Sequence, residues 1–202
     1  TVIIFIGIFF RFYHLTASPP ALNWDEVSIG YNAYSILQTG RDEWGEFLPL
    51  SFKAFGEHKL PGMIYASIPG IWLFGTTDFG VRFTPAVLGV VAIYLIYLLT
   101  KKLFGSETQA LGSALLMAVS PWAIHFSRVS FEAGFAMVLM MISIYYLLGS
   151  STRPKHLWLS MLFAVLAAYT YNSIRIFLPL MFLGYLFTGA IPWRHLSLRR
   201  LV

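Results

Sequence analysis

Residues 83–100 read FTPAVLGVVAIYLIYLLT, contain no charged side chain and are followed by Lys101 and Lys102. A transmembrane helix needs about 20 predominantly apolar residues, so this stretch predicts a membrane-spanning helix that ends at two lysines. Comparable runs predict further spans, the first of which we expect to be cut short by the start of the sequence. These runs cover residues 1–14, 108–126, 134–151, 156–173 and 176–193.

The composition agrees with an all-α integral membrane protein that has about six transmembrane helices. Of the 202 residues, 57% are hydrophobic and 11% are charged, whereas soluble domains are about 45–50% apolar and about 25% charged. The net charge of +5 does not indicate a nucleic-acid-binding protein, because the basic residues flank apolar runs instead of sharing one polar surface. The absence of cysteine excludes disulfide bonds, thiol catalysis and Cys-ligated metals.

The charges also predict how the spans are oriented in the membrane. Basic residues accumulate on the cytoplasmic side of membrane proteins, and at one end of the predicted helices Glu107 is the single acidic residue. Residues 15–82, called the first loop below, connect the first two spans at the other end and are therefore expected on the extracytoplasmic side. The basic residues of the predicted cytoplasmic end are Lys101, Lys102, Arg153, Lys155, Arg194, Arg199 and Arg200.

Residues 60–77 are uncharged as well, but they contain Pro61, Pro69 and three glycines. This run is short and interrupted for a span, and counting it as one would move Lys101 and Lys102 to the extracytoplasmic side. We therefore expect it to form an interfacial or re-entrant helix within the first loop.

The first loop contains the segment NWDE at residues 23–26. Asn23 is a favourable N-cap, and Glu26, three residues later, completes a capping box. Acidic residues at a helix start are favoured by the helix dipole alone, but Asp25 does not cap and is suited to take a proton from an acceptor hydroxyl. An amphipathic helix at the membrane surface, ending near Gly40, is predicted from the helical spacing of Val27, Tyr31, Tyr34 and Leu37.

Other polar residues of the first loop have two interpretations each. Lys59 stands where the polar loop meets an apolar run, and it either reaches to the membrane surface or binds a lipid phosphate. His58 either binds a ligand or is an ordinary surface histidine. The side chains of Asp42, Glu43 and Glu46 form either a divalent-cation site or, as we expect, a solvated loop.

Charges also stand at the extracytoplasmic ends of the predicted spans. Arg128 and Glu132 have the spacing of a helix ion pair, but charges beside a span also commonly line a polar cavity. Three further arginines also stand at extracytoplasmic span ends: Arg11, Arg82 and Arg175. Because arginine binds phosphate well, this group near the acidic pair suggests an anionic ligand that is met from the outer leaflet.

Taken in chain order, these features resemble the N-terminal half of a GT-C glycosyltransferase of family 39. That group includes the protein mannosyltransferases and the lipid A aminoarabinose transferases, and the resemblance extends over nearly the whole sequence. It rests on Trp24-Asp25-Glu26, Gly40 to Gly45 and Pro49-Leu50, Lys59 to Pro61 and Tyr65, Phe74-Gly75 to Val81-Arg82-Phe83, Ser120-Pro121-Trp122, Ser127-Arg128 to Phe131-Glu132, and Tyr169-Thr170-Tyr171 to Arg175.

The resemblance implies a GT-C-type bundle in the cytoplasmic or plasma membrane, with residues 1–202 as its N-terminal part and the active site on the extracytoplasmic face. It implies a polyprenyl-phosphate sugar as donor and a protein, lipid or glycan as acceptor, with inversion at the anomeric carbon. Neither a nucleotide sugar nor a metal cofactor is expected to be required.

Carried over to this sequence, the resemblance implies that Asp25 is the catalytic base, that Glu26 is its neighbour and that Lys59 binds phosphate. The other matched positions are implied to shape the site or to contact phosphate, and they are Arg128, Glu132 and Arg175.

Two other classes of protein remain compatible with the sequence. A multi-span transporter or flippase for an anionic lipid-linked substrate usually has its functional charges near the bilayer midplane, in broken helices. Here the charges stand at span ends, which favours catalysis at the membrane surface. A non-catalytic membrane subunit would give no reason for Asp25, Lys59 and the arginines to lie together.

Overall fold

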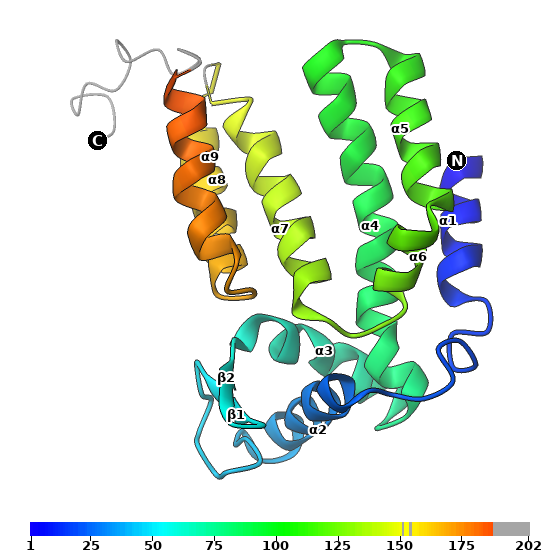
Figure 1. Ribbon diagram of the computed structural model, residues 1–202, viewed down its shortest axis with the longest axis vertical. Helices are drawn as coiled ribbons and strands as arrows, with labels where there is room; N and C mark the ends of the chain where they lie inside the picture. Colours follow the sequence, from blue (N-terminus) through cyan, green and yellow to red (C-terminus); the bar gives the residue numbers. More distant parts are fainter. Residues whose placement is uncertain (151, 154, 188–202) are drawn as a thin grey trace.

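A computed structural model describes residues 1–150, 152–153 and 155–187 (Figure 1). The end of the predicted span at 176–193, together with Arg194, Arg199 and Arg200, lies outside these residues. The described residues form helices α1 (Val2–Phe12), α2 (Trp24–Thr39), α3 (Pro61–Phe74), α4 (Asp78–Phe104), α5 (Glu107–Val119), α6 (Pro121–Ser127), α7 (Glu132–Leu147), α8 (Lys155–Ala168) and α9 (Ile174–Phe187), and strands β1 (Phe52–Ala54) and β2 (Glu57–Lys59).

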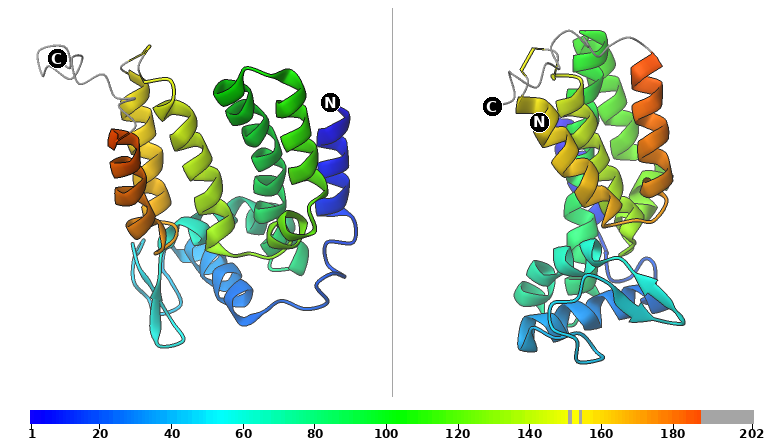
Figure 2. Two further views of the ribbon diagram at one scale, coloured as in Figure 1. Left: turned by 45° about the horizontal axis from the view of Figure 1, so that its top comes forward. Right: turned by 90° about the vertical axis from the view of Figure 1, so that its left-hand side faces the viewer.

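The helices form two groups that run in different directions. Helices α1, α4, α5, α7, α8 and α9 lie side by side, whereas α2, α3 and the strands lie across one end of them (Figures 1 and 2). We call this the loop end; the short connections before α7 and before α9 also lie there. The N-terminus and the α4–α5 connection lie at the opposite end.

Helix length sets α4 apart from the other helices. Among the described residues, α4 is the one helix that is long and apolar enough to cross a bilayer by itself. Helices α5 and α6 are long and apolar enough when taken together, although the angle between them is 60°. The shorter apolar helices are α1, α3, α7 and α8, so the number of crossings stays a prediction.

The break between α5 and α6 corrects the prediction of one continuous helix over 108–126. Pro121 has no backbone N–H and cannot continue the hydrogen-bond ladder of α5. Ser120 instead caps the next helix, because its side-chain oxygen accepts a hydrogen bond from the backbone N–H of Ala123. The chain therefore turns at Ser120, close to the loop end.

The first loop contains both of the predicted helices. The capping box at the start of α2 is confirmed, because Asn23 Oδ1 accepts from the Glu26 N–H and Glu26 Oε2 accepts from the Asn23 N–H. Gly40 ends α2 with φ +70°. The run at 60–77 forms α3, and the N–H of Gly62 donates to the carbonyl of Tyr169, in the connection before α9.

A two-stranded antiparallel hairpin departs from the predicted all-α fold. Phe52 pairs with Lys59 and Ala54 with Glu57, so that Phe55 and Gly56 form a two-residue turn. Strands of three residues are too short to show the alternation of apolar and polar residues that predicts a strand.

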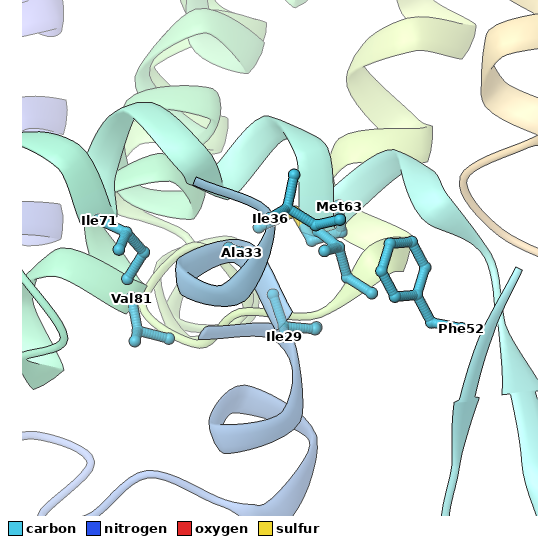
Figure 3. Close-up of a cluster of buried hydrophobic side chains, with 8 residues drawn as sticks. Ile29, Ala33, Ile36, Phe52, Met63, Ile71 and Val81 are labelled. Carbon is cyan, nitrogen blue, oxygen red and sulfur yellow. The ribbon is translucent and has the colours of Figure 1, made fainter. Parts of the chain in front are cut away.

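The first loop has its own hydrophobic core, in which α2 packs against α3 and the start of α4 (Figure 3). The residues whose spacing predicted α2 do not form this core, because Val27 and Tyr31 are 51% and 54% exposed. The buried residues of α2 lie on the opposite face of the helix, about half a turn around its axis. The cluster consists of Ile29, Ala33, Ile36, Phe52, Met63, Ile64, Ile71 and Val81.

Two glycines in neighbouring helices give a matched test of this packing. A methyl group on Gly89 of α4 would collide with Ser127 and Arg11, whereas one on Gly112 of α5 would meet nothing within 4 Å. Overpacking costs about 1–3 kcal/mol, and replacing an exposed helical glycine with alanine gains about 0.5–1 kcal/mol. We expect Gly89→Ala to lower, and Gly112→Ala to maintain or raise, the thermal unfolding midpoint of the full-length protein in detergent. Equal midpoints for the two variants would contradict this packing.

Candidate active site

Asp25 and Lys59 form an ion pair at the loop end. Asp25 lies in the first turn of α2, Lys59 is the last residue of β2, and the lysine ammonium donates a hydrogen bond to Asp25 Oδ1. The side chain of Lys59 is 4% exposed and that of Asp25 is 29% exposed. Two residues predicted as base and phosphate ligand therefore lie together, with the carboxylate on the open side.

The hairpin explains why Lys59 reaches Asp25. Phe52, the partner of Lys59 across the hairpin, is fully buried in the core of the first loop. It packs edge-on against Tyr65 of α3, and the Tyr65 hydroxyl donates to the carbonyl of Pro49. Burial raises the pKa of Tyr65, and the charge of Asp42 raises it further. These contacts hold the hairpin against α2 and α3.

A third predicted residue, Glu132, lies near the pair. It is the first residue of α7, is partly buried, and is close enough to Lys59, Asp25 and Glu57 for their charges to act on it. One of these carboxylates, that of Asp25, is in direct contact with the ammonium. Carboxylates accept hydrogen bonds and can therefore bind the hydroxyl groups of a polyhydroxylated substrate.

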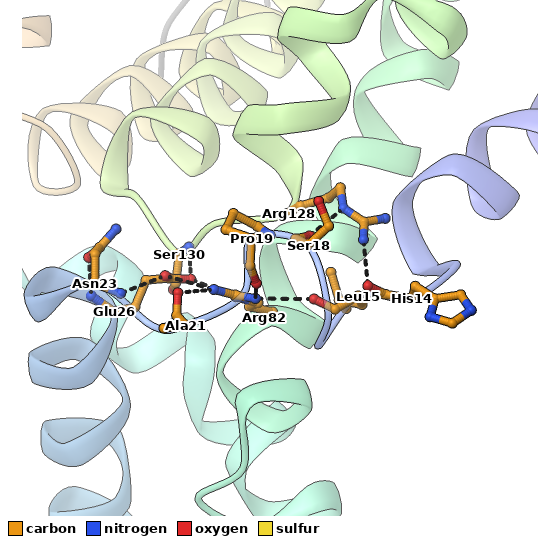
Figure 4. A network of polar contacts seen from close by, with 10 residues as sticks. All are labelled: His14, Leu15, Ser18, Pro19, Ala21, Asn23, Glu26, Arg82, Arg128 and Ser130. Atoms are coloured by element: carbon orange, nitrogen blue, oxygen red, sulfur yellow. Dashed lines mark hydrogen bonds and ion pairs between the residues drawn. The ribbon is translucent and has the colours of Figure 1, made fainter.

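Glu26, although adjacent to Asp25 in sequence, belongs to a different set of contacts. It is 1% exposed, and its two oxygens accept from Arg82 Nε and Nη2 at 3.0 and 3.2 Å (Figure 4). It also accepts from the backbone N–H of Ser130 at 3.1 Å. With the capping contact to Asn23, these bonds favour a structural role for Glu26 over the predicted catalytic one.

Arg82 continues this network into the segment that follows α1. The guanidinium is fully buried and donates at 2.7–3.2 Å to backbone carbonyls in that segment. An irregular segment has no helix or sheet partner for its carbonyls, so a multiple donor such as arginine satisfies them. The three accepting residues are Leu15, Pro19 and Ala21.

The contacts of Arg128 favour a structural role over the predicted role as a phosphate ligand. The residue is 8% exposed, and all three of its guanidinium nitrogens donate to carbonyls at the end of α1 and beyond it. The ion pair predicted between Arg128 and Glu132 is not among those of the described residues. Arg11 likewise donates hydrogen bonds to backbone carbonyls, those of Gly7, Met117 and Ala118. The bonds of Arg128 at 2.8–2.9 Å go to the carbonyls of Phe10, Tyr13, His14 and Ser18.

The remaining candidates lie apart from the Asp25–Lys59 pair or have other partners. Arg175 is exposed and donates to the carbonyl of Ala168 at 3.2 Å. His58 is exposed, and its Nδ1 lies 3.3 Å from the hydroxyl of Ser51. Both residues stand at the loop end, and neither has a contact that assigns it to a substrate.

The acidic residues at 42–46 organise a turn. Asp42 is 4% exposed and accepts from the backbone N–H groups of Trp44 and Glu46, both at 2.9 Å. Glu43 accepts from the side-chain amide of Asn32. In the described part of the chain, no group of three or more His, Asp or Glu side chains is arranged to hold a metal ion.

Comparison with known proteins now identifies the family. Residues 61–201 match the family described as dolichyl-phosphate-mannose-protein mannosyltransferase. The chain belongs to this family. Family membership confirms the resemblance seen in the sequence, and proteins of this family are embedded in membranes. Asp25 and Lys59 precede the matched segment, so their roles rest on the geometry of the first loop.

Other comparisons add little to this family assignment. The chain is 32% identical over 166 residues to an uncharacterized protein of Aquifex aeolicus (strain VF5). The aligned region covers 75% of this chain and 33% of the relative. The chain therefore spans about a third of the length of that relative. No solved structure matches the chain.

The Glu26–Arg82 pair can be tested by a double-mutant cycle. Arg82→Met leaves the Glu26 carboxylate buried without its partner, and losing one member of a buried ion pair costs about 3–5 kcal/mol. We expect Arg82→Met to destabilise the full-length protein strongly in detergent, and Glu26→Leu combined with Arg82→Met to recover part of the loss. If the losses of unfolding free energy in Glu26→Leu and Arg82→Met sum to the loss in the double variant, the two side chains do not interact.

Proposed function

We propose that the protein transfers a sugar from a polyprenyl-phosphate donor to an acceptor hydroxyl at the membrane surface, with inversion. The observation that carries this proposal is the Asp25–Lys59 pair, in which a partly exposed carboxylate stands beside a nearly buried ammonium. The family to which the chain belongs supports the reaction class.

In this mechanism Asp25 accepts the proton of the acceptor hydroxyl while the acceptor oxygen attacks the anomeric carbon. The bond from the anomeric carbon to the phosphate oxygen breaks, and the lipid phosphate leaves with the electron pair. Lys59 is suited to hold that phosphate, because an ammonium has three N–H donors and can contact carboxylate and phosphate together. In this proposal Glu132 accepts hydrogen bonds from sugar hydroxyls, a role that a carboxylate can perform.

The proposed setting is the membrane surface. The apolar runs of the sequence support about six crossings, and in this proposal the loop end with Asp25 faces the extracytoplasmic side. The charges that the first loop brings together are at one end of the bundle rather than at its middle, as expected for catalysis on a lipid-linked head group. No obligatory metal or other cofactor is part of the proposal; the acceptor is a protein, lipid or glycan.

Substitution of Asp25 tests the proposed base. General-base assistance is worth about 10²–10⁴ in rate, so Asp25→Asn in the full-length protein should lower the transfer of labelled sugar from polyprenyl-phosphate donors in membranes by at least about a hundredfold. Membrane insertion should be unchanged and the protein should still fold, because Asp25 is outside the Glu26–Arg82 network and asparagine keeps an oxygen that can accept from Lys59. The unfolding midpoint of the variant is measured alongside, so that lost turnover is not confused with lost folding.

The matched control is Glu46→Gln, which removes an exposed carboxylate from the same loop and should leave transfer unchanged. Near-normal turnover by Asp25→Asn would contradict the assignment of the base. Absence of turnover by folded wild-type protein with all donors would contradict the reaction itself.

A further inference from the structure

Two exposed aromatic rings flank the Asp25–Lys59 pair. Trp24, directly before Asp25, is 73% exposed, and Phe55, at the tip of the hairpin, is 66% exposed. Their ring centroids are 5.9 Å apart with a 35° angle between the planes, and the Lys59 ammonium lies 5.8 Å from the Phe55 centroid. The two rings thus form one apolar surface beside the proposed base.

The backbone at Phe55 shows that folding does not favour this residue there. Phe55 has φ +50° and Gly56 has φ +82°, so both residues of the two-residue turn are left-handed. Asparagine followed by glycine is the preferred sequence for such a turn, whereas a bulky residue with positive φ is a strained outlier. Strained residues of this kind cluster at ligand-binding and active sites.

The surroundings indicate what the rings bind. A flat aromatic surface suits the apolar C–H face of a sugar ring, and the nearby carboxylates of Asp25, Glu57 and Glu132 can accept hydrogen bonds from the hydroxyl groups at its edge. Aromatic residues at membrane surfaces also serve as anchors. An anchor, however, needs neither an adjacent group of carboxylates nor a ring held at a strained turn.

We propose that Trp24 and Phe55 form a platform against which a pyranose ring of the substrate stacks, next to Asp25. This inference rests on the proposed function and names the residues that would select a sugar. The stacked ring is that of the lipid-linked donor, or that of a glycan acceptor, and the two sources are separated by measuring donor affinity and acceptor KM independently.

The first measurement is equilibrium binding to the full-length protein in detergent, without turnover. The probes are polyprenyl-phosphate mannose, polyprenyl-phosphate glucose and polyprenyl phosphate alone. Wild type should bind a sugar-bearing lipid more tightly than the bare lipid phosphate. Phe55→Asn and Trp24→Leu should weaken binding of that sugar lipid by about tenfold, without changing the affinity for polyprenyl phosphate.

A matched control separates stacking from membrane anchoring. Phe47 is also an aromatic residue of the first loop and is 66% exposed, like Phe55. Phe47→Asn should leave binding unchanged, and Phe55→Asn should have an unfolding midpoint equal to or above that of wild type, since asparagine relieves the turn. Similar losses for Phe47→Asn and Phe55→Asn, extending to polyprenyl phosphate, would overturn the platform in favour of an anchor.

Turnover measurements show whether the stacked sugar belongs to the donor or to the acceptor. They also separate the proposed platform from the proposed transfer reaction. An unchanged donor affinity with about a tenfold higher KM for a glycan acceptor in Phe55→Asn would support the platform and assign it to the acceptor. Normal donor affinity and normal acceptor KM in both Phe55→Asn and Trp24→Leu would overturn the platform while the proposed transfer stands. Selective sugar-lipid binding by a wild type that transfers nothing would support the platform and contradict the transfer.

Discussion

The buried ion pair between Glu26 and Arg82 is the constraint on which the rest of the loop end depends. It connects the start of α2 to the start of α4, and through Ser130 to the connection before α7. Arg82 and Arg128 connect the segment after α1 to this network by donating hydrogen bonds to its backbone carbonyls. A buried ion pair gains little net stability because both charges lose their hydration. Its effect here is positional, since the start of α2, the start of α4 and the connection before α7 meet at one carboxylate.

The positions of two consecutive acidic residues follow from that constraint. Successive residues of an α-helix point about 100° apart, so when Glu26 is directed into the network, Asp25 is directed to the open side of α2. There it meets Lys59, which the hairpin delivers from 34 residues further along the chain. One carboxylate is therefore held rigidly by buried partners, and the adjacent one remains accessible for chemistry.

The arginines show how a membrane-associated chain uses charge at the ends of its helices. Backbone carbonyls that leave a helix need hydrogen-bond partners when water is excluded. Arg11, Arg82 and Arg128 supply these donors, and the guanidinium groups that the sequence suggested for phosphate are thereby occupied. Lys59 uses its charge differently, because its ammonium pairs with the carboxylate of Asp25 and not with backbone carbonyls.

The sequence by itself determined the features that depend on neighbouring residues: the apolar helices, the capping box at Asn23, the end of α2 at Gly40 and the family resemblance. Only the tertiary structure decided which face of α2 is buried, because Ile29 and Val27 are both apolar and the choice depends on what α3 presents. It also decided the partners of Arg128 and the meeting of Asp25 with Lys59. These contacts join residues far apart in the chain, and local spacing carries no information about them.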